Sequence, residues 1–343
     1  MDGSRRVEIG AWGGPEVVRM VRDAGPPQPG AGQLRVRVEA STVNATDAVI
    51  RKGLYPLLRD RPPLTLGYDL VGVVDRVGPG VAGGAVGTRV AALVQVGGNA
   101  DHALVPAGSA VPVPTSAPAG EAAALVLGWF TALQVLDLAG VGAGHRLLVH
   151  GGSGAVGTAL LQLARLRGAE VVATASAAKL AHVRAQGAVA LDRRDPGLAR
   201  RLRQLGGFDA VVDPLGPGSA RRSFGLLRPR GTLVTLGTLL AAGRIPRRTP
   251  AAFLRFGTAF GMLKAGLAIG ERLPGERRAR FYGVVDSVRA DPARQARDLT
   301  HLFDLLAAGA IAPVVTELPL DGARRAHGLL DAGQVRGQLV LVT

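Results

Sequence analysis

The stretch Leu147-Leu148-Val149-His150-Gly151-Gly152-Ser153-Gly154-Ala155-Val156-Gly157 decides the fold class of this chain. Its glycines recur at three-residue intervals, after an apolar strand pattern (146–150) and before a helical pattern (155–167). Glycine fills about one position in seven, so roughly one such string arises by chance, and the flanking strand and helix supply the specificity. Glycines there allow a tight turn, and the helix N-terminus offers free N–H groups to a diphosphate. The stretch predicts a dinucleotide-binding turn with Ser153, Gly154, Ala155 and Val156 as binding residues; the alternative is a structural glycine-rich loop.

Strand and helix patterns alternate after residue 121. Strands are expected over 170–174, 208–213 and 231–236, and helices over 178–186 and 218–227. Repeated strand–helix–strand units predict a doubly wound parallel sheet. The first 120 residues instead carry short strand patterns between glycine and proline turns, at 35–40, 70–77 and 89–94. The chain closes with a helix expected over 298–308 and a strand over 338–342, so the fold class is α/β with a β-rich N-terminal domain.

The composition excludes several classes of protein. The 343 residues include no cysteine, which excludes disulfides, thiolate nucleophiles and zinc sites built on thiolates. The formal net charge is +15, but the basic residues are nearly all arginine and are spread over the whole chain, which argues against nucleic-acid binding. Residues 1–10 hold no apolar block, so no secretory signal is expected. The longest uncharged apolar stretch, 122–136, is too short to cross a bilayer, and we expect a cytoplasmic protein without a transmembrane segment.

The end of the second strand of the dinucleotide-binding unit predicts the choice of cofactor. An NAD site needs an acidic residue there to hold the ribose 2′-hydroxyl, and this strand instead runs into Ala175-Ser176-Ala177-Ala178-Lys179. Ser176 can donate a hydrogen bond and Lys179 supplies a positive charge, so the site favours the 2′-phosphate of NADPH. In the alternative reading, Ser176 caps the next helix and Lys179 is solvated.

The order of motifs resembles the zinc-independent quinone oxidoreductases of the medium-chain dehydrogenase/reductase superfamily. The resemblance covers nearly the whole chain. Besides the glycine turn, it rests on Val43-Asn44-Ala45-Thr46-Asp47, Arg51-Lys52-Gly53-Leu54-Tyr55-Pro56, Gly87-Thr88-Arg89-Val90, Thr131-Ala132 and Asp213-Pro214-Leu215-Gly216. The last motif and the long stretch after Gly237 look most like the synaptic vesicle membrane amine-transport-protein-like branch.

The resemblance implies a domain organisation. Residues 1–121 would form the N-terminal part of a GroES-like catalytic domain. Residues 122–275 would form a Rossmann NADPH-binding domain with a helical extension at 238–275, and residues 276–343 would return to the catalytic domain. The cofactor would lie in the cleft between the domains, and a homodimer is expected. Phenylalanines at helix-like spacing in the extension favour ordinary helix packing over a membrane face.

The resemblance also indicates that the reaction runs without a metal. Zinc-dependent members of the superfamily build their site from cysteine and a Gly-His-Glu string. This chain carries Gly67-Tyr68-Asp69 in that place and has no cysteine, and none of its six histidines lies in a ligand-spaced pair. Without a Lewis acid to stabilise an alkoxide, a quinone or an activated C=C becomes the natural hydride acceptor.

Matching family positions imply the residues of the active site. Asn44 and Tyr55 would project toward nicotinamide and substrate as hydrogen-bond donors, with Tyr55 as a proton source unless it only packs beside Pro56 and solvent supplies the proton. Thr131 would lie beside the nicotinamide, unless it is simply buried. Arg193 stands where the family often has tyrosine and would stack on adenine or pair with the 2′-phosphate, unless it is solvated. The remaining cofactor contacts are expected from Leu236 and Gly237.

Two further polar residues are expected to be structural. Asp47 fits a helix cap better than an acid catalyst, because it stands three residues after Asn44 in a loop-to-helix segment. His150 ends a buried strand and fits a hydrogen-bonded core histidine.

Three functions remain open from the sequence. The first is an NADPH-dependent reductase of quinones or α,β-unsaturated carbonyls. The second is a stand-alone enoyl reductase on a carrier-bound, polyketide-like intermediate, in which the arginine-rich surface would meet an acidic carrier protein. The third is a non-catalytic nucleotide-binding protein that keeps the fold.

Overall fold

We describe the protein from a computed structural model that covers residues 3–81, 85–236 and 276–343. The chain forms two compact units. Among the described residues, the first unit contains those up to Phe130 and those from Pro292 to Thr343, and the second contains those from Thr131 to Asp291. The chain returns from the second unit to the first after Asp291, whereas the sequence placed this return after residue 275. The difference arises because β14 (Arg278–Phe281) pairs with the sheet of the second unit. The helical extension expected over 238–275 lies outside the described residues.

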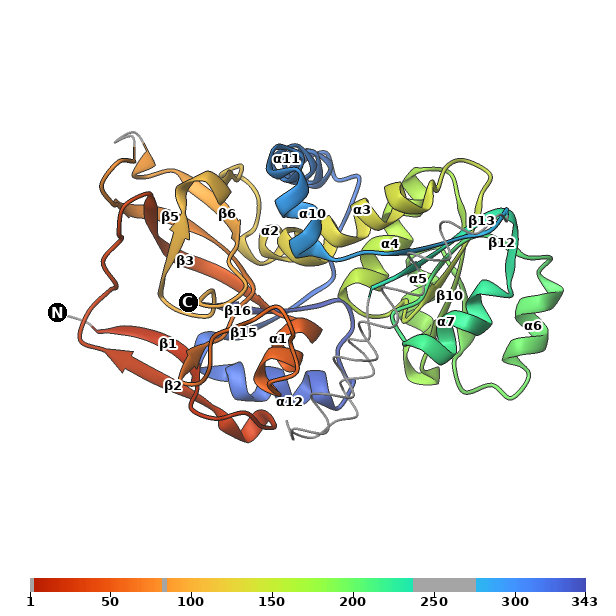
Figure 1. Ribbon diagram of the computed structural model, residues 1–343, viewed down its shortest axis with the longest axis horizontal. Helices are drawn as coiled ribbons and strands as arrows, with labels where there is room; N and C mark the ends of the chain where they lie inside the picture. Colours follow the sequence, from red (N-terminus) through yellow and green to blue (C-terminus); the bar gives the residue numbers. More distant parts are fainter. Residues whose placement is uncertain (1–2, 82–84, 237–275) are drawn as a thin grey trace. The chain divides into compact units, whose positions relative to one another are not determined.

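The second unit is built on a parallel sheet of six strands (Figure 1). Its spatial order is β11 (Val189–Asp192), β10 (Glu170–Ala175), β9 (Arg146–His150), β12 (Phe208–Val212), β13 (Leu227–Thr235) and β14. Every neighbouring pair runs parallel, which confirms the doubly wound sheet expected from the sequence. The strand order reverses between β9 and β12, and dinucleotides bind at the carboxyl ends of the strands beside such a reversal.

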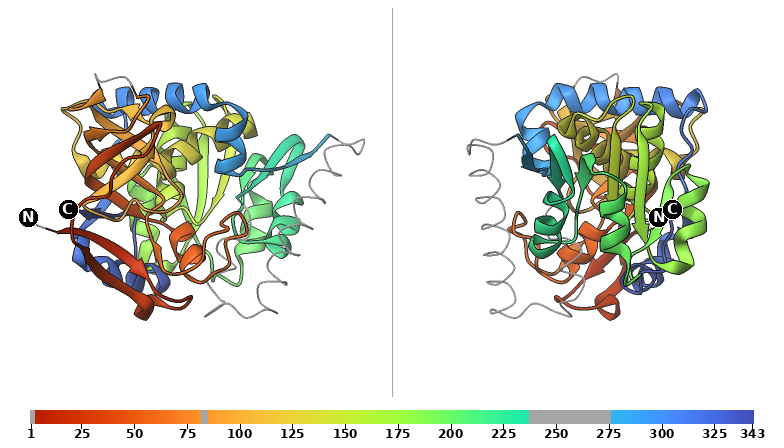
Figure 2. Two further views of the ribbon diagram at one scale, coloured as in Figure 1. Left: turned by 60° about the vertical axis from the view of Figure 1, so that its left-hand side comes forward. Right: turned by 90° about the vertical axis from the view of Figure 1, so that its right-hand side faces the viewer.

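Helices cover both faces of this sheet (Figure 2). Right-handed crossovers place α4 (Ala155–Leu166) and α5 (Leu180–Ala185) on one face and α7 (Pro217–Phe224) on the other. The strand residues that face α7 belong to a buried cluster that includes Leu148, Val172, Phe208, Val211 and Leu233. The other helical segments that the structure describes in this unit are α3 (Phe130–Ala139), the 3-10 turn η5 (Ala177–Lys179), α6 (Leu198–Gln204) and α10 (Val284–Ala290).

The two edge strands of this sheet were not expected from the sequence. β14 reads Arg-Ala-Arg-Phe and lacks the continuous apolar run of the central strands, whereas β11 has only four residues, Val-Ala-Leu-Asp, of which three are apolar. Edge strands are covered by neighbours on one side only and therefore tolerate charged residues, which removes the sequence signal. The helix expected over 218–227 also ends earlier, at Phe224, because Leu227 begins β13 opposite Phe208.

In the ranges that the structure describes, the first unit contains two sheets. The larger has the order β15 (Val315–Pro319), β16 (Gln338–Val342), β3 (Gln33–Val43), β5 (Asp69–Val77), β6 (Arg89–Leu93) and β8 (Val111–Pro112), with β7 (His102–Pro106) also paired to β3. The smaller has the order β2 (Val18–Asp23), β1 (Ser4–Ile9) and β4 (Leu64–Thr65). β16 runs antiparallel to β3, so the C-terminal segment completes a sheet begun near the N-terminus, as the resemblance implied.

Short helices surround these sheets. Those in the described residues are α1 (Ala45–Arg51), α2 (Ala119–Ala124), a π-helical segment (Leu125–Trp129), the longer α11 (Pro292–Ala307) and α12 (Ala323–Asp331), with 3-10 turns at Pro15–Val17, Ala107–Ser109 and Leu320–Gly322. The fully buried Arg51 at the end of α1 donates to Asp331 Oδ2 of α12 at 2.7 Å. This ion pair fixes α1, and with it the residues at its start, against the C-terminal segment.

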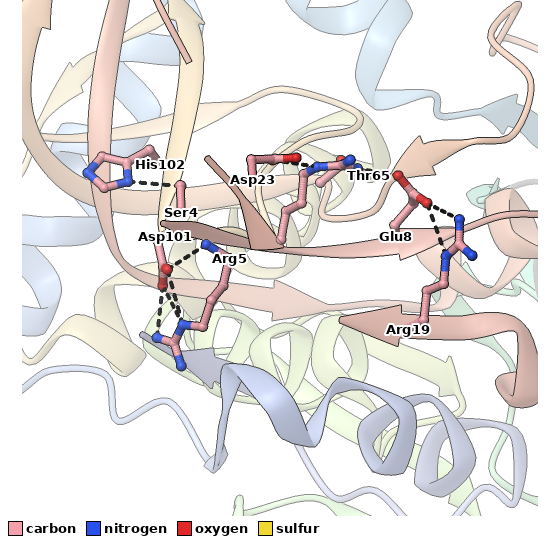
Figure 3. Close-up of polar contacts among 9 residues, drawn as sticks. Ser4, Arg5, Glu8, Arg19, Asp23, Thr65, Asp101 and His102 are labelled. Atoms are coloured by element: carbon pink, nitrogen blue, oxygen red, sulfur yellow. Dashed lines mark hydrogen bonds and ion pairs between the residues drawn. The ribbon is translucent and has the colours of Figure 1, made fainter. Parts of the chain in front are cut away.

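Ion pairs hold the N-terminal hairpin of β1 and β2 in place (Figure 3). Buried Glu8 accepts from Arg19 Nη2 at 2.5 Å and from Arg6, while Arg5 binds Asp101 at 2.8 Å. Burial alone would raise the pKa of Glu8, but the hydrogen bonds from the two arginines outweigh it and lower that pKa. Some of the chain's many arginines, here Arg5, Arg6 and Arg19, therefore form ion pairs that stabilise this hairpin.

One continuous helix, Ala119–Ala139, is long and apolar enough to cross a membrane by length and composition. It joins α2, the π-helical segment and α3. Its most apolar window is 89% buried inside the structure, which is the pattern of a core helix. The uncharged stretch 122–136 noted in the sequence lies within this helix, between Glu121 and Asp137.

Candidate active site

The glycine turn between β9 and α4 is shaped by close backbone packing. Gly151 has φ +80°, a conformation that favours glycine, and the N–H groups of Gly151 and Gly152 both donate to the Thr174 carbonyl at 3.0 Å. A Cβ on Gly152 would come within 2.6 Å of the Ala173 side chain, and one on Gly157 within 2.2 Å of the Gly151 carbonyl oxygen. The turn itself therefore requires these three glycines.

Gly154 differs from the other glycines of the turn. It is the N-cap of α4 with φ −85°, and a Cβ there would meet nothing closer than the Gly151 carbonyl oxygen at 3.7 Å, which is ordinary contact. Internal packing therefore does not require glycine at this position. Ala155 and Val156 follow in the first turn, where backbone N–H groups lack intrahelical acceptors, and Ser153 is buried beside them. Backbone N–H groups in this position are of the kind that bind a diphosphate, and the assignment of these residues to the cofactor stays a prediction.

The adenosine end of the expected cofactor site gathers three of the predicted residues. Ser176 follows β10 directly, and its side chain makes no capping hydrogen bond, contrary to the alternative reading. The Arg193 N–H donates to the Ala175 carbonyl at 2.8 Å, which holds exposed Arg193 beside that strand end. Half-buried Lys179 closes the 3-10 turn, with its N–H bonded to the Ser176 carbonyl at 2.8 Å. Asp192 ends β11 nearby, and its Oδ1 accepts from the Arg194 N–H.

Four polar residues near the point where the strand order reverses form a continuous chain of hydrogen bonds. His150 Nδ1 lies 2.9 Å from Thr174 Oγ1, and His150 Nε2 lies 3.2 Å from Ser223 Oγ. The Ser223 hydroxyl donates to Asp213 Oδ2 at 2.6 Å. Burial lowers the pKa of His150, although the Asp213 carboxylate opposes this. His150 thus has partners for both ring nitrogens, as expected of a core histidine.

The other expected cofactor residues are distributed along the second unit. Thr131 is buried in α3, and half-buried Leu236 directly follows β13. Gly237 lies outside the described residues.

In the first unit, Asn44 stands at the end of a buried hydrogen-bond chain. It is the N-cap of α1, and its Nδ2 donates to Thr42 Oγ1. The Thr42 hydroxyl donates to Asp69 Oδ1 at 2.6 Å, and the Thr42 backbone N–H donates to the same oxygen at 3.0 Å. All three residues are buried. The sequence analysis identified Asn44 but missed Thr42.

Asp47 holds the start of α1. Its Oδ2 accepts from the Asn44 N–H at 2.8 Å and its Oδ1 from the Gly67 N–H at 3.2 Å. The side chain is fully buried and both of its oxygens are engaged by backbone groups. This is the capping role that the sequence predicted.

Tyr55 is paired with a second tyrosine. The two hydroxyl oxygens of Tyr55 and Tyr68 lie 2.8 Å apart, and the rings meet edge to face at 6.1 Å between centroids. Tyr68 is buried, whereas Tyr55 is partly exposed. The sequence analysis took Gly67-Tyr68-Asp69 only as the loss of a metal-binding string, and so it missed that Tyr68 supports Tyr55.

The residues around this string do not fit a catalytic zinc ion. Tyr68 directs its hydroxyl to Tyr55, Asp69 Oδ1 is occupied by Thr42, and the chain offers no cysteine. In the part of the chain that the structure describes, no group of three or more His, Asp or Glu side chains could hold a metal ion. The donor chemistry is that of a hydrogen-bonding site.

The buried carboxyls of Asp47 and Asp69, near Asn44, make the free energy of unfolding depend on pH. Burial raises the pKa of Asp69 to about 7 despite the opposing hydrogen bonds from Thr42, and burial together with the charge of Asp69 raises the pKa of Asp47 to about 7. The folded state therefore holds protons that the unfolded chain releases near pH 4. The stabilising contribution is present at low pH and lost as the pH rises toward 7.

Asp69→Asn is expected to remove part of this dependence. The amide keeps an acceptor oxygen for Thr42 and cannot ionise, so the melting temperature of the variant relative to wild type should rise from pH 5 to pH 8. Thermal unfolding at both pH values measures it. A difference between variant and wild type that does not change with pH would contradict the raised pKa.

Two protein-family descriptions match the chain. The alcohol dehydrogenase GroES-like domain matches residues 30–115, and the zinc-binding dehydrogenase family matches residues 185–341. The second description names a metal for which this chain lacks the donors.

Curated relatives cover most of the chain. The synaptic vesicle membrane protein VAT-1 homolog of Rattus norvegicus is 32% identical, over 98% of this chain and 84% of that protein. The match to the human homolog is 36% identical and covers 68% of this chain, and it spans only 61% of the human protein's length. The spectinabilin polyketide synthase system protein NorB of Streptomyces orinoci is 34% identical over 90% of this chain, which corresponds to 13% of that protein.

Solved structures show the same fold. A mycobacterial protein solved in complex with NADPH is 32% identical, with a TM-score of 0.81 over 99% of this chain and all of that chain. Escherichia coli quinone oxidoreductase in complex with NADPH is 25% identical, with a TM-score of 0.83 over 99% of this chain and all of that chain. The chain therefore belongs to the medium-chain dehydrogenase/reductase superfamily, in the branch of the quinone oxidoreductases and the VAT-1 homologs.

Proposed function

We propose that the protein reduces quinones or the C=C bond of α,β-unsaturated carbonyls with NADPH and without a metal. The observation that carries the proposal is the hydroxyl pair of Tyr55 and Tyr68, 2.8 Å apart. It supplies hydrogen-bond donors where zinc-dependent members of the superfamily carry a metal-binding string. A developing enolate or hydroquinone oxygen needs such donors, because no Lewis acid takes up its charge.

NADPH is favoured by the second unit. Open space at Gly154 and the free N–H groups of α4 suit the diphosphate. Ser176, Lys179 and Arg193 gather at the ends of β10 and β11, where a 2′-phosphate would need donors and positive charge. Relatives solved with NADPH support the same choice.

Three side chains of the first unit, Tyr55, Tyr68 and Asn44, have separate roles in the reduction of the hydride acceptor. When bound, NADPH supplies the hydride that adds to the β-carbon of an enone or to a quinone. Tyr55 donates a hydrogen bond to the oxygen that gains negative charge. For a quinone it then gives its proton to that oxygen, and for an enone a proton that exchanges with solvent adds to the α-carbon, which completes the addition of two hydrogens. Tyr68 donates to the Tyr55 oxygen and stabilises the phenolate that remains until solvent returns the proton. Asn44 contributes an amide that holds the reactants without adding charge.

A carrier-bound substrate is the second candidate. The 34% identity to a segment of a polyketide synthase system protein supports it. The second unit also exposes arginines suited to an acidic carrier protein, at positions 193, 194, 200, 201, 221 and 222. In either case we propose a cytoplasmic homodimer, which ultracentrifugation can test for its oligomeric state.

An NADPH-oxidation assay distinguishes these functions. We expect turnover with 9,10-phenanthrenequinone or with members of an enone panel. A marked preference for an enoyl thioester on an acyl carrier protein over the same free thioester would support the second candidate. Tight NADPH binding with no turnover of any acceptor would favour a non-catalytic nucleotide-binding protein instead.

Activity is expected to survive removal of metal ions. The chain lacks the ligands of the zinc-dependent enzymes, so exhaustive treatment with a chelator should leave the turnover number unchanged. Elemental analysis of the same sample should find less than stoichiometric zinc. Lost activity that returns on addition of zinc would overturn the metal-free mechanism.

A further inference from the structure

The hydrogen bonds beneath Asn44 all run in one direction. The Thr42 backbone N–H can only donate, so Asp69 Oδ1, which receives it at 3.0 Å, must be an acceptor. The Thr42 hydroxyl gives its single proton to the same oxygen at 2.6 Å. Its lone pairs are what remain for Asn44, and only the amide nitrogen can donate to them.

This direction fixes how Asn44 is presented. With Nδ2 bonded to Thr42, the carbonyl oxygen of the amide faces the backbone N–H of Asp47 in the capping box, and one N–H remains for a ligand. A reversed amide would bring two acceptor oxygens together, which costs a buried hydrogen bond. The direction does not depend on the charge of Asp69, because the backbone N–H of residue 42 keeps Oδ1 as the acceptor when a proton sits on Oδ2.

We propose that Thr42 and Asp69 are positioning residues that hold the Asn44 amide in a single orientation for the reaction. The inference rests on the proposed function, since it assumes that Asn44 meets the bound ligands. In that orientation the Asn44 carbonyl oxygen stays with the Asp47 backbone N–H, and the remaining N–H donates to a developing negative charge on a ligand. Asp69, which stands at the end of the former metal-binding string, thereby acts on the site through Thr42.

The neighbouring residue Ser41 provides a matched control. Thr42 and Ser41 are consecutive in β3 and both are buried, but their side chains point to opposite faces of the strand. Within the described ranges, Ser41 Oγ has no hydrogen-bond partner. Removing the Ser41 hydroxyl perturbs the same strand without touching the chain to Asn44.

The test compares Thr42→Val, Thr42→Ser and Ser41→Ala by kcat and KM at saturating NADPH. Valine matches threonine in shape and keeps the backbone N–H bond to Asp69, so only the hydroxyl is lost. We expect Thr42→Val to lower kcat by about 10-fold or more, the scale of a lost transition-state contact, with Thr42→Ser restoring it and Ser41→Ala leaving it unchanged. Equal losses in Thr42→Val and Thr42→Ser, or no loss in Thr42→Val, would overturn the positioning role.

A second readout does not depend on catalysis. In ¹⁵N-labelled full-length protein with NADPH, the Asn44 side-chain N–H bonded to Thr42 should exchange slowly with solvent, and Thr42→Val should abolish this protection. If wild type turns over no acceptor, the proposed function fails, and exchange alone decides the orientation of the amide. If wild type is active and exchange is the same in both proteins, the positioning inference fails by itself.

Discussion

Tyr55→Phe is expected to lower the turnover number on an enone by roughly 10- to 1000-fold, because the lost hydrogen bond strengthens only as charge develops on the substrate oxygen. Asn44→Ala should cause a loss in the same range. NADPH affinity should change little in either variant, because the residues predicted to bind the diphosphate and the 2′-phosphate belong to the other unit. Steady-state kinetics with an enone and a direct binding titration measure both effects.

Quinones and Tyr68 supply the internal controls for this prediction. Quinone reduction should respond less to Tyr55→Phe than enone reduction does, since a hydroquinone oxygen can collect its proton from solvent after hydride transfer. Tyr68→Phe should give a smaller loss than Tyr55→Phe, because it removes only the hydroxyl that lies 2.8 Å from the proton donor. Intact enone turnover in Tyr55→Phe, together with inactive Asn44→Ala, would mean that Tyr55 only packs and that water supplies the proton. If neither change matters, the acceptor site has been assigned to the wrong residues.

Lys179→Ala should weaken NADPH binding by roughly 1.5 to 3 kcal/mol while leaving NADH nearly unchanged, which is the scale of a charge-assisted hydrogen bond. Lys179 stands three residues after Ser176, in the turn that follows β10, where the 2′-phosphate is expected. Isothermal titration with both cofactors measures the difference.

Arg203→Ala is a suitable control for Lys179→Ala. It removes one positive charge from the exposed C-terminal end of α6. This helix leads into the start of β12, so Arg203 lies near the amino ends of the strands, whereas the cofactor is expected at their carboxyl ends. Its effect on NADPH binding should be small. Equal losses of NADPH and NADH affinity in Lys179→Ala would refute the assignment of the 2′-phosphate site.

The sequence predicted the parts of the fold whose signal is local. Strands 146–150 and 338–342 coincide with β9 and β16, because each is a buried apolar run bounded by turns. The edge strand β14 was missed, since partial exposure lets charged residues replace the apolar pattern, and β11 was missed because it has only four residues. The end of the first unit's N-terminal segment was also placed early, because α2, the π-helical segment and α3 form one uninterrupted helix with no composition change at the boundary.

The candidate site divides in the same way. The glycine turn could be identified because its backbone requirements fall on consecutive residues. Tyr68 and Thr42 could not, because their roles depend on contacts with Tyr55 and Asp69, which lie on other segments of the chain. Only the fold shows that the string in place of the metal-binding motif supports both Tyr55 and, through Thr42, Asn44.

Transfer of deuterium from NADPH labelled at C4 of the nicotinamide is the most direct test of the central claim. Both C4 epimers should be incubated with wild-type protein and an enone in ordinary water, and the product examined by mass spectrometry and NMR. The proposed mechanism predicts that one epimer places a single deuterium on the β-carbon, while the α-carbon gains its hydrogen from solvent. The mechanism would be contradicted if NADPH bound tightly but no deuterium reached the β-carbon of any enone and no quinone was reduced to its hydroquinone.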